Sequence, residues 1–136
     1  MARGLRNNNP LNIRHSSDTF VGELPGADKA FKTFTDKAHG YRAAFVTLHT
    51  YLTKYGRNTI EKIITAWAPP EDNNDTEAYI AAVEKESGIP RDKALTASDG
   101  KDYIKIVAAM SKVENGKTAS MSEVKDGFKL QWKIKE

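Results

Sequence analysis

Hydrophobic residues recur at helical spacing through most of the chain after residue 36. Over 36–55 the apolar stripe has spacings of four, three, four and three, and it consists of Tyr41, Phe45, Leu48, Leu52 and Tyr55. This spacing puts the five side chains on one face of a helix, which Gly56 can end. We expect this helix to be the central helix of the core.

Capping residues and helix stops predict the remaining helices. Asn74 and Glu77 have capping-box spacing, and Pro69 with Pro70 would stop the helix before them. We expect Trp132, in the tail, to hold the C-terminus against the body of the protein. The predicted helices lie at about 59–67, 74–88, 103–116 and 120–128.

The segment before residue 36 lacks helical periodicity. Two β-capable stretches, 19–24 and 30–34, flank a Pro-Gly turn and predict a small hairpin that must rest on helices. The predicted fold class is therefore mainly α: a compact, single-domain helical fold with a small β-hairpin near the N-terminus. Within it, 1–35 would form a loop and hairpin region and 36–136 the helical body.

The composition and motifs of the chain exclude several classes of function. The 136 residues include no cysteine, and 21 Lys and Arg against 18 Asp and Glu give a net charge of only +3. We find no metal-ligand spacing among the histidines, no phosphate-binding glycine loop and no serine nucleophile elbow, so no metal and no cofactor is predicted. No apolar run fits a membrane span or a secretory signal, which predicts synthesis in the cytoplasm without a signal peptide.

The segment 4–14 is unusually rich in side-chain amides. Pro10 follows three asparagines, and because it excludes a helix interior and pushes Asn9 out of the α region, we expect a loop. Asparagine amides both donate and accept hydrogen bonds, which suits sugar hydroxyls and N-acetyl groups. The alternative is that these asparagines only cap and shape an N-terminal turn.

Glycoside cleavage needs a carboxylic acid with a raised pKa beside an apolar wall. Glu114 ends a predicted helix, with apolar residues one and two turns behind it, and is our preferred candidate. Glu23 lies in the hairpin region, close in sequence to the amide-rich loop, and is the reserve. Glu86 also ends a predicted helix, but its charged neighbours indicate an exposed position. For each of them an exposed charge without a catalytic role is the alternative.

Several motifs together carry a resemblance to a known family. They are Arg3-Gly-Leu-Arg-Asn-Asn-Asn-Pro-Leu-Asn-Ile-Arg14, Gly40-Tyr-Arg-Ala43 and Trp67-Ala-Pro-Pro70, followed by Asn74, Thr76 and Tyr79. Over roughly 3–90 the chain resembles small phage and prophage proteins described as virion structural or lysozyme-like proteins. The Asn-Asn-Pro-x-Asn-Ile element is similar to the loop that lines the glycan groove of cell-wall glucosaminidases and lytic transglycosylases.

The chain departs from those enzymes at the catalytic glutamate, which in them precedes the loop at a helix end. Here only six residues precede Asn7, and none is acidic. Either the chain keeps a sugar-binding groove without the acid, or a circular permutation lets Glu114 supply it. The permutation hypothesis requires the Glu114 carboxyl to share a cleft with the loop amides.

The resemblance implies a single lysozyme-like domain over 1–136. Together with the residues above, it predicts a phage or prophage protein that recognises the glycan strands of peptidoglycan. As an enzyme it would be a muramidase, glucosaminidase or lytic transglycosylase. Glu114 would be the general acid and Glu23 the reserve, and the predicted sugar-contacting residues are Asn8, Asn9, Asn12, Arg14, Trp67 and Tyr79. We expect a monomer that acts in the virion or at the cell wall, with other virion proteins as further partners.

Two alternatives belong to other classes of function. A non-catalytic virion structural or cell-wall-binding domain would need the same groove without a buried carboxylate. A nucleic-acid-binding module would need a basic patch, and the available residues are Arg3, Arg6, Arg14, Lys29, Lys32, Lys37 and Arg42. Because acidic residues are interspersed and no recognition motif accompanies them, nucleic acid is the less favoured partner.

Overall fold

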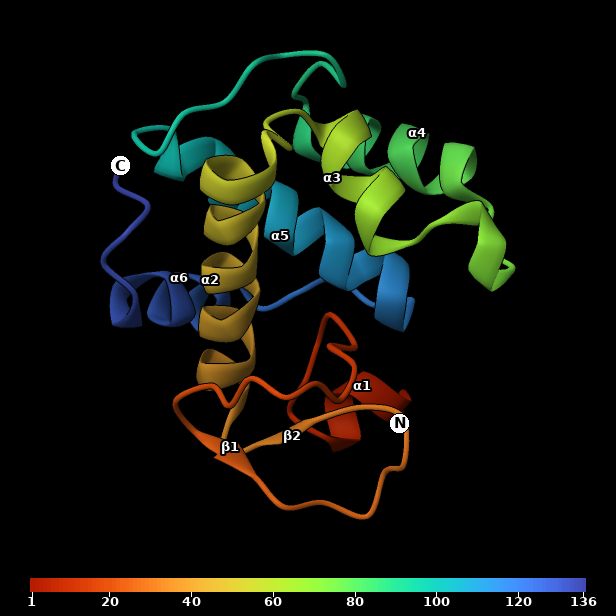
Figure 1. Cartoon of the computed structure of the whole chain (residues 1–136), viewed down its shortest axis with the longest axis vertical. Coiled ribbons are helices and arrows are strands. Elements are labelled where there is room, and N and C mark those ends of the chain that lie inside the picture. Colours follow the sequence, from red (N-terminus) through yellow and green to blue (C-terminus); the bar gives the residue numbers. More distant parts are fainter.

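The computed structural model describes residues 1–136 and is mainly helical, with one small sheet near the N-terminus (Figure 1). The helices are α1 (Arg3–Arg6), α2 (Lys37–Tyr55), α3 (Ile60–Trp67), α4 (Thr76–Ser87), α5 (Gly100–Asn115) and α6 (Met121–Leu130), and the strands are β1 (Glu23–Leu24) and β2 (Thr33–Phe34). A 3-10 turn, η1 (Pro70–Asp72), joins α3 to α4. The predicted fold class is confirmed at this level. None of the helices combines the length and apolar character needed to cross a membrane.

Local signals account for most helix ends. The helices α2, α4 and α5 each end at a glycine in the left-handed conformation, as predicted, at Gly56, Gly88 and Gly116. The predicted cap of α4 is wrong by one residue. The Asp75 carboxylate accepts from the backbone N–H of Ala78, whereas the Asn74 amide donates to the Pro69 carbonyl. A carboxylate also interacts favourably with the positive end of the helix dipole.

The N-terminal segment differs from its prediction in two details. A one-turn helix, α1, precedes the loop, because Pro10 restricts only the residue directly before it and leaves 3–6 free to coil. The hairpin is shorter than predicted, pairing Glu23 with Phe34 and Leu24 with Thr33 in antiparallel register. Beyond this register the chain turns around Asp28, whose carboxylate accepts from two backbone N–H groups and so ends the pairing early.

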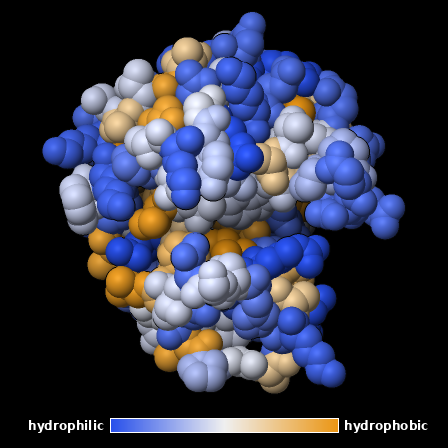
Figure 2. All heavy atoms as spheres, viewed as in Figure 1, coloured by the Kyte–Doolittle hydropathy of each residue, from blue (hydrophilic) through white to orange (hydrophobic).

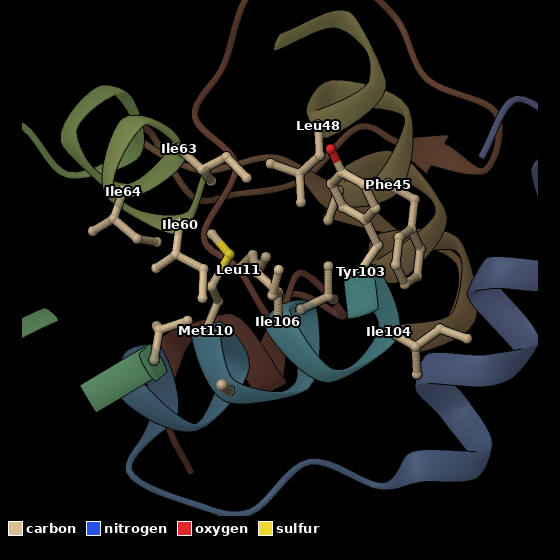
Figure 3. Close-up of a cluster of buried hydrophobic side chains, with 14 of the residues drawn as sticks. Leu11, Phe45, Leu48, Ile60, Ile63, Ile64, Tyr103, Ile104, Ile106 and Met110 are labelled. Atoms are coloured by element: carbon tan, nitrogen blue, oxygen red, sulfur yellow. The ribbon is translucent and has the colours of Figure 1, made fainter. Parts of the chain in front are cut away.

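The core is centred on α5, which contributes eight buried residues, whereas α2 contributes six. The expectation that α2 is the central helix is therefore wrong. The apolar stripe predicted for α2 is not buried along its whole length, because Tyr55, at the C-terminal end of the helix, is 54% exposed. Leu11, from the N-terminal loop, lies among core side chains that include Ile106 and Met110 of α5 (Figure 3). The loop is thus held to the helical body by a fully buried side chain.

The C-terminal tail is held by residues other than the predicted one. Trp132 is 75% exposed, while Gln131 and Ile134 are buried. The Gln131 amide donates to the carbonyls of Phe128 and Ile134, and its oxygen accepts from the Ile134 N–H. These bonds turn the chain so that Ile134, and not Trp132, faces the body.

Candidate functional site

The half-buried carboxyl of Glu114 lies in the last turn of α5 and is bound on both oxygens. Asn12 Nδ2 donates to Glu114 Oε1 over 2.8 Å. The Tyr79 hydroxyl donates to Glu114 Oε2 over 2.9 Å. The two donors come from the N-terminal loop and from α4, so three separate parts of the chain meet at this carboxyl.

Burial raises the pKa of Glu114, because the charged form loses solvation. The hydrogen bonds from Asn12 and Tyr79 and the positive charge of Arg14 oppose this shift, since each favours the carboxylate. Burial also raises the pKa of Tyr79 well above its ordinary value, and the Glu114 charge adds to the effect. Tyr79 is therefore a neutral hydrogen-bond donor, and Glu114 holds its proton to a higher pH than an exposed glutamate.

A cavity of about 180 Å³ adjoins this carboxyl, between the N-terminal loop and the segment that joins α3 to α4. The space-filling view shows the face indented across its middle, between an upper and a lower part of the molecule (Figure 2). The cavity is lined by Leu11, Asn12, Arg14, Phe31, Trp67, Ala68, Asp72, Asn74 and Glu114. Its wall therefore combines two carboxylates, two amides, a guanidinium and two aromatic rings.

The three predicted sugar-contacting asparagines have different positions. Asn9 is fully buried, and its amide donates to the backbone carbonyls of Ile13 and Lys32, so it shapes the loop and is closed to a ligand. Asn8 donates to the Phe34 carbonyl and accepts from a lysine ammonium. Only Asn12 reaches both the cavity and the carboxyl. The interpretation of these amides as loop-shaping groups therefore holds for Asn9 and largely for Asn8.

The backbone of the loop explains why asparagine occupies two of these positions. Asn8 and Asn12 have φ values of 52° and 54°, in the left-handed region that asparagine tolerates better than most residues. This turn places the Asn12 amide against α5. At the next residue of that helix, the Asn115 amide donates to the Pro10 carbonyl over 2.7 Å. Two neighbouring side chains of α5 thus bind the same loop.

Gly4 lies at the point where α1, the loop and α5 meet. A Cβ atom at Gly4 would lie 2.7 Å from the Asn9 carbonyl oxygen and 2.8 Å from the Oδ1 atoms of Asn12 and Asn115. Side chains essentially never approach backbone oxygen this closely, so only glycine fits here. The amide-rich loop and the end of α5 are thus brought together by the absence of a side chain.

The remaining predicted contacts also lie near Glu114. Arg14 lines the cavity, with its guanidinium carbon 5.2 Å from the centroid of the Phe31 ring. The half-buried Trp67 ring lines the opposite side. Tyr79 is buried behind the carboxyl and reaches it with its hydroxyl, so it acts on Glu114 and does not line the cavity.

Asp72 is the charged cavity residue to which the sequence analysis assigned no role. It belongs to η1, is exposed, lines the cavity, and neither accepts a hydrogen bond from a protein side chain nor forms an ion pair. Asp75, three positions further along, caps α4 instead. The only signal for Asp72 was its short distance in sequence from Trp67 across a double proline.

The other candidate carboxylates lie elsewhere. Both oxygens of Glu23 are 3.0 Å from the ammonium of Lys32, whose side chain is only 1% exposed. Glu23 therefore neutralises a buried cation in the hairpin, and it does not line the cavity beside Glu114. Glu86 forms a half-exposed ion pair with Lys112. No group of three or more His, Asp or Glu side chains is placed to hold a metal ion.

The basic residues needed for nucleic-acid binding are partly engaged within the protein. Arg3 binds the Asp28 carboxylate at 2.6 Å, and Lys32 is buried against Glu23. The Lys37 ammonium donates to the Asn8 side chain. Three of the seven cations that this alternative requires therefore have partners inside the molecule, which weakens the case for a continuous phosphate-binding surface.

No family model matches the chain. Protein P5 of Pseudoalteromonas phage PM2 is 45% identical to it over 132 residues, which cover 93% of this chain and 80% of the phage protein. The chain belongs to the protein P5 family. Identity at this level over nearly the whole length implies a common fold, so the arrangement around Glu114 can be compared between the two P5-type proteins. The predicted relation to phage proteins is confirmed.

Proposed function

We propose that this P5-type protein binds the glycan strands of peptidoglycan in the cavity beside Glu114 and cleaves a glycosidic bond there. The observation that supports the proposal most directly is a half-buried carboxyl, with a raised pKa and a donor on each oxygen, beside an open cavity with aromatic and amide walls. A general acid in a glycosidase needs this combination of retained proton and access to substrate.

In the proposed reaction Glu114 gives its proton to the oxygen of the scissile glycosidic bond as that bond breaks. The carboxylate left behind is stabilised by Asn12 and Tyr79, which already donate to both of its oxygens. Burial thus holds the proton before the reaction, and the two donors accommodate the charge that remains after it. General acid catalysis of this kind contributes roughly 10²- to 10⁴-fold to a rate.

The residues across the cavity supply what sugar recognition requires. The Trp67 ring offers an apolar face for a pyranose ring. The Asn74 amide nitrogen is already bound to the Pro69 carbonyl, so its oxygen is left to accept from a sugar hydroxyl. Arg14 can donate to ring substituents from the side of the N-terminal loop.

The product of bond cleavage depends on whether Asp72 acts as a base. A carboxylate without an internal partner, in the same cavity as the acid, can activate a water molecule and so give hydrolysis. Without such a base, an internal sugar hydroxyl would attack instead and give an anhydro product. The position of Asp72 favours hydrolysis over formation of an anhydro product.

The architecture implied by this proposal is lysozyme-like, with its order along the chain changed. A helix-end glutamate and an amide-rich groove loop face each other, but here the loop precedes the glutamate. The relation to a phage protein agrees with action in the virion or at the host cell wall. We expect the protein to meet peptidoglycan there as a monomer, together with other virion proteins.

A non-catalytic wall-binding or virion structural role is the alternative, and one observation favours it. Because both oxygens of Glu114 are bound by protein donors, the carboxyl also ties the N-terminal loop to α4 and α5. In that case the groove would bind glycan, and Glu114 would serve only to hold it together.

The test is digestion of purified, insoluble peptidoglycan, with soluble muropeptides measured by chromatography and mass spectrometry. We expect release by the wild type and a loss of about 100-fold or more in Glu114→Gln. The matched control is Glu86→Gln, another helix-end glutamate, which lies in an exposed ion pair and should leave the rate unchanged.

The outcomes separate the two roles. Sedimentation with peptidoglycan but no release by any form of the protein would establish the wall-binding role and refute catalysis. Equal release by the wild type and Glu114→Gln would refute Glu114 as the acid. Neither sedimentation nor release would refute recognition of peptidoglycan altogether.

A further inference from the structure

A second, larger cavity of about 550 Å³ lies along α2, where the segment 18–21 crosses the helix. Its lining differs from that of a core cavity, because threonine hydroxyls and charged side chains alternate with aromatic rings. The lining residues are Asp18, Thr19, Phe20, Val21, Arg42, Val46, Thr47, Thr50, Tyr51 and Tyr55. None of them has a role in the reaction proposed for Glu114.

The two cavities are neighbours. Tyr51 lines the larger one, and its ring centroid is 6.1 Å from that of Trp67, which lines the smaller one. Figure 2 shows one face of the molecule indented across its middle, with hydrophobic atoms exposed there. A polymer whose reacting bond lies at Glu114 can therefore continue past the Trp67 and Tyr51 rings into the larger cavity.

We propose that the cavity along α2 binds further sugar rings of the same glycan strand, so that the protein takes a polymer and not an isolated disaccharide. This inference rests on the proposed function, since it assumes that glycan occupies the cavity beside Glu114. From Arg42 to Tyr55 the wall of the cavity runs along fourteen residues of helix, a rise of about 20 Å. A wall of this length accommodates more than one ring.

The threonines of α2 present acceptors to this cavity. Thr47 donates its hydroxyl proton to the Ala43 carbonyl over 2.8 Å, and Thr50 donates to the Val46 carbonyl over 3.2 Å. Because these protons are committed to the helix backbone, the lone pairs of the two hydroxyls remain for donors from outside. Sugar hydroxyls are such donors, and Arg42 can donate in return to sugar oxygens.

The tyrosine rings are held in place before any ligand arrives. The guanidinium carbon of Arg57 lies 4.6 Å from the Tyr51 ring centroid and 4.5 Å from that of Tyr55, so one cation contacts both rings. Tyr55 nevertheless remains 54% exposed. A fixed, exposed aromatic ring beside hydroxyl acceptors suits stacking against a pyranose ring, and it loses little conformational freedom on binding.

The test measures binding of β-1,4-linked N-acetylglucosamine oligomers by calorimetry, in the Glu114→Gln background so that no cleavage occurs. We expect the hexamer to bind more tightly than the dimer. Adding Tyr55→Ala should weaken hexamer binding about three- to tenfold and leave dimer binding unchanged. The control is Trp132→Ala, which removes an even more exposed aromatic ring outside both cavities and should have no effect.

The results distinguish this inference from the proposed function. If peptidoglycan is cleaved but Tyr55→Ala binds hexamer and dimer as the parent does, the cavity along α2 is not part of the glycan site, and the site at Glu114 stands. If neither oligomer binds and peptidoglycan is not cleaved, both proposals fail. Because Tyr55 is exposed, the variant should fold normally, which circular dichroism would verify.

Discussion

Asn12 and Glu114 are 102 positions apart in the sequence, yet the Asn12 amide donates to the Glu114 carboxyl over 2.8 Å. This contact joins the amide-rich N-terminal loop to the end of α5. The permutation hypothesis requires Asn8, Asn9 and Asn12 to share one cleft with the carboxyl, and this holds for Asn12 alone. The loop that carries Asn12 is also anchored by Leu11, which lies in the core. Glu114 also accepts a hydrogen bond from the Tyr79 hydroxyl.

The raised pKa of Glu114 predicts how its replacement affects stability. Between the unfolded pKa, about 4.3, and the higher folded pKa, the folded state holds the proton more tightly, so wild-type stability falls as pH rises through this window. The Glu114→Gln variant has no carboxyl to titrate at this position, so it does not lose this stability as pH rises. The melting temperature of the variant, relative to wild type, should therefore be higher at pH 7 than at pH 4. A difference that is constant or falls with pH would contradict the assignment.

Tyr79→Phe should shift the pH dependence of peptidoglycan cleavage. The hydroxyl favours the carboxylate, so its removal raises the pKa of Glu114 further, and the acid stays protonated to higher pH. We expect the alkaline limb of the rate profile to move up by about one pH unit. Tyr103→Phe is the matched control, because its buried hydroxyl has no partner and does not contact Glu114. An unchanged profile in Tyr79→Phe would refute the coupling.

Asp72→Asn should change the products more than the fold. Its carboxylate is exposed and binds no protein group, so the melting temperature should stay within about 2 °C. If Asp72 activates water, the variant should release hydrolysed muropeptides at least about tenfold more slowly. Mass spectrometry in H₂¹⁸O would detect this as slower accumulation of products labelled at the reducing end. Glu71→Gln is the control, and anhydro products from the wild type would exclude the role of Asp72.

Gly4→Ala should destabilise the protein by about 1–3 kcal/mol, because the new methyl group would press against the Asn9 carbonyl oxygen. Cleavage activity should fall as well, since the loop carrying Asn12 would move away from α5. Gly88→Ala provides the comparison. It has open space around it but a φ of 73°, so it should cost about 1 kcal/mol and leave activity intact. Denaturant unfolding measures the free energy of unfolding of both variants. A Gly4→Ala variant as stable as the wild type would contradict the close packing around Gly4.

The Asp28 carboxylate predicts acid sensitivity of the N-terminal segment. The hydrogen bond from Arg3 holds the pKa of Asp28 far below its ordinary value, with further bonds from the Phe31 and Ala30 backbone. This stabilisation is complete above the unfolded pKa of about 3.9 and is lost progressively as pH falls from there toward the much lower folded pKa. Asp28→Asn should therefore lower the melting temperature more at pH 7 than at pH 2.5, where part of the stabilisation is already lost. Equal losses at both pH values would show that the charge is unimportant.

The helical body was predictable because its signals are local. A glycine that ends a helix and a residue that caps one act within a few positions of themselves, as at Gly56 and Thr59. The position of Trp132 was not predictable, since it depends on how Gln131 bonds the backbone around it. The short hairpin likewise depends on Asp28, which lies outside the two paired strands.

The candidate site was predictable where a residue type and a helix end coincide. Glu114 follows from its place at a predicted helix end, and Asn12 follows from the amide-rich loop and the family resemblance; their proposed roles stay predictions. The different roles of the neighbouring amides were not predictable, because Asn9 is closed off by the Lys32 carbonyl, 23 positions away. Nor could the sequence show which carboxylate of the run 71–75 faces the cavity, since that depends on the turn of η1.

The contact between Asn12 and Glu114 has a consequence for biosynthesis. The amide-rich loop is synthesised before α5, and the Glu114 carboxyl, at the end of α5, follows it. Any nascent or prematurely terminated polypeptide that stops before α5 is finished consequently carries the loop without the acid. Such a partial translation product lacks the contact between Asn12 and Glu114, because only a chain that extends through Glu114 holds both partners.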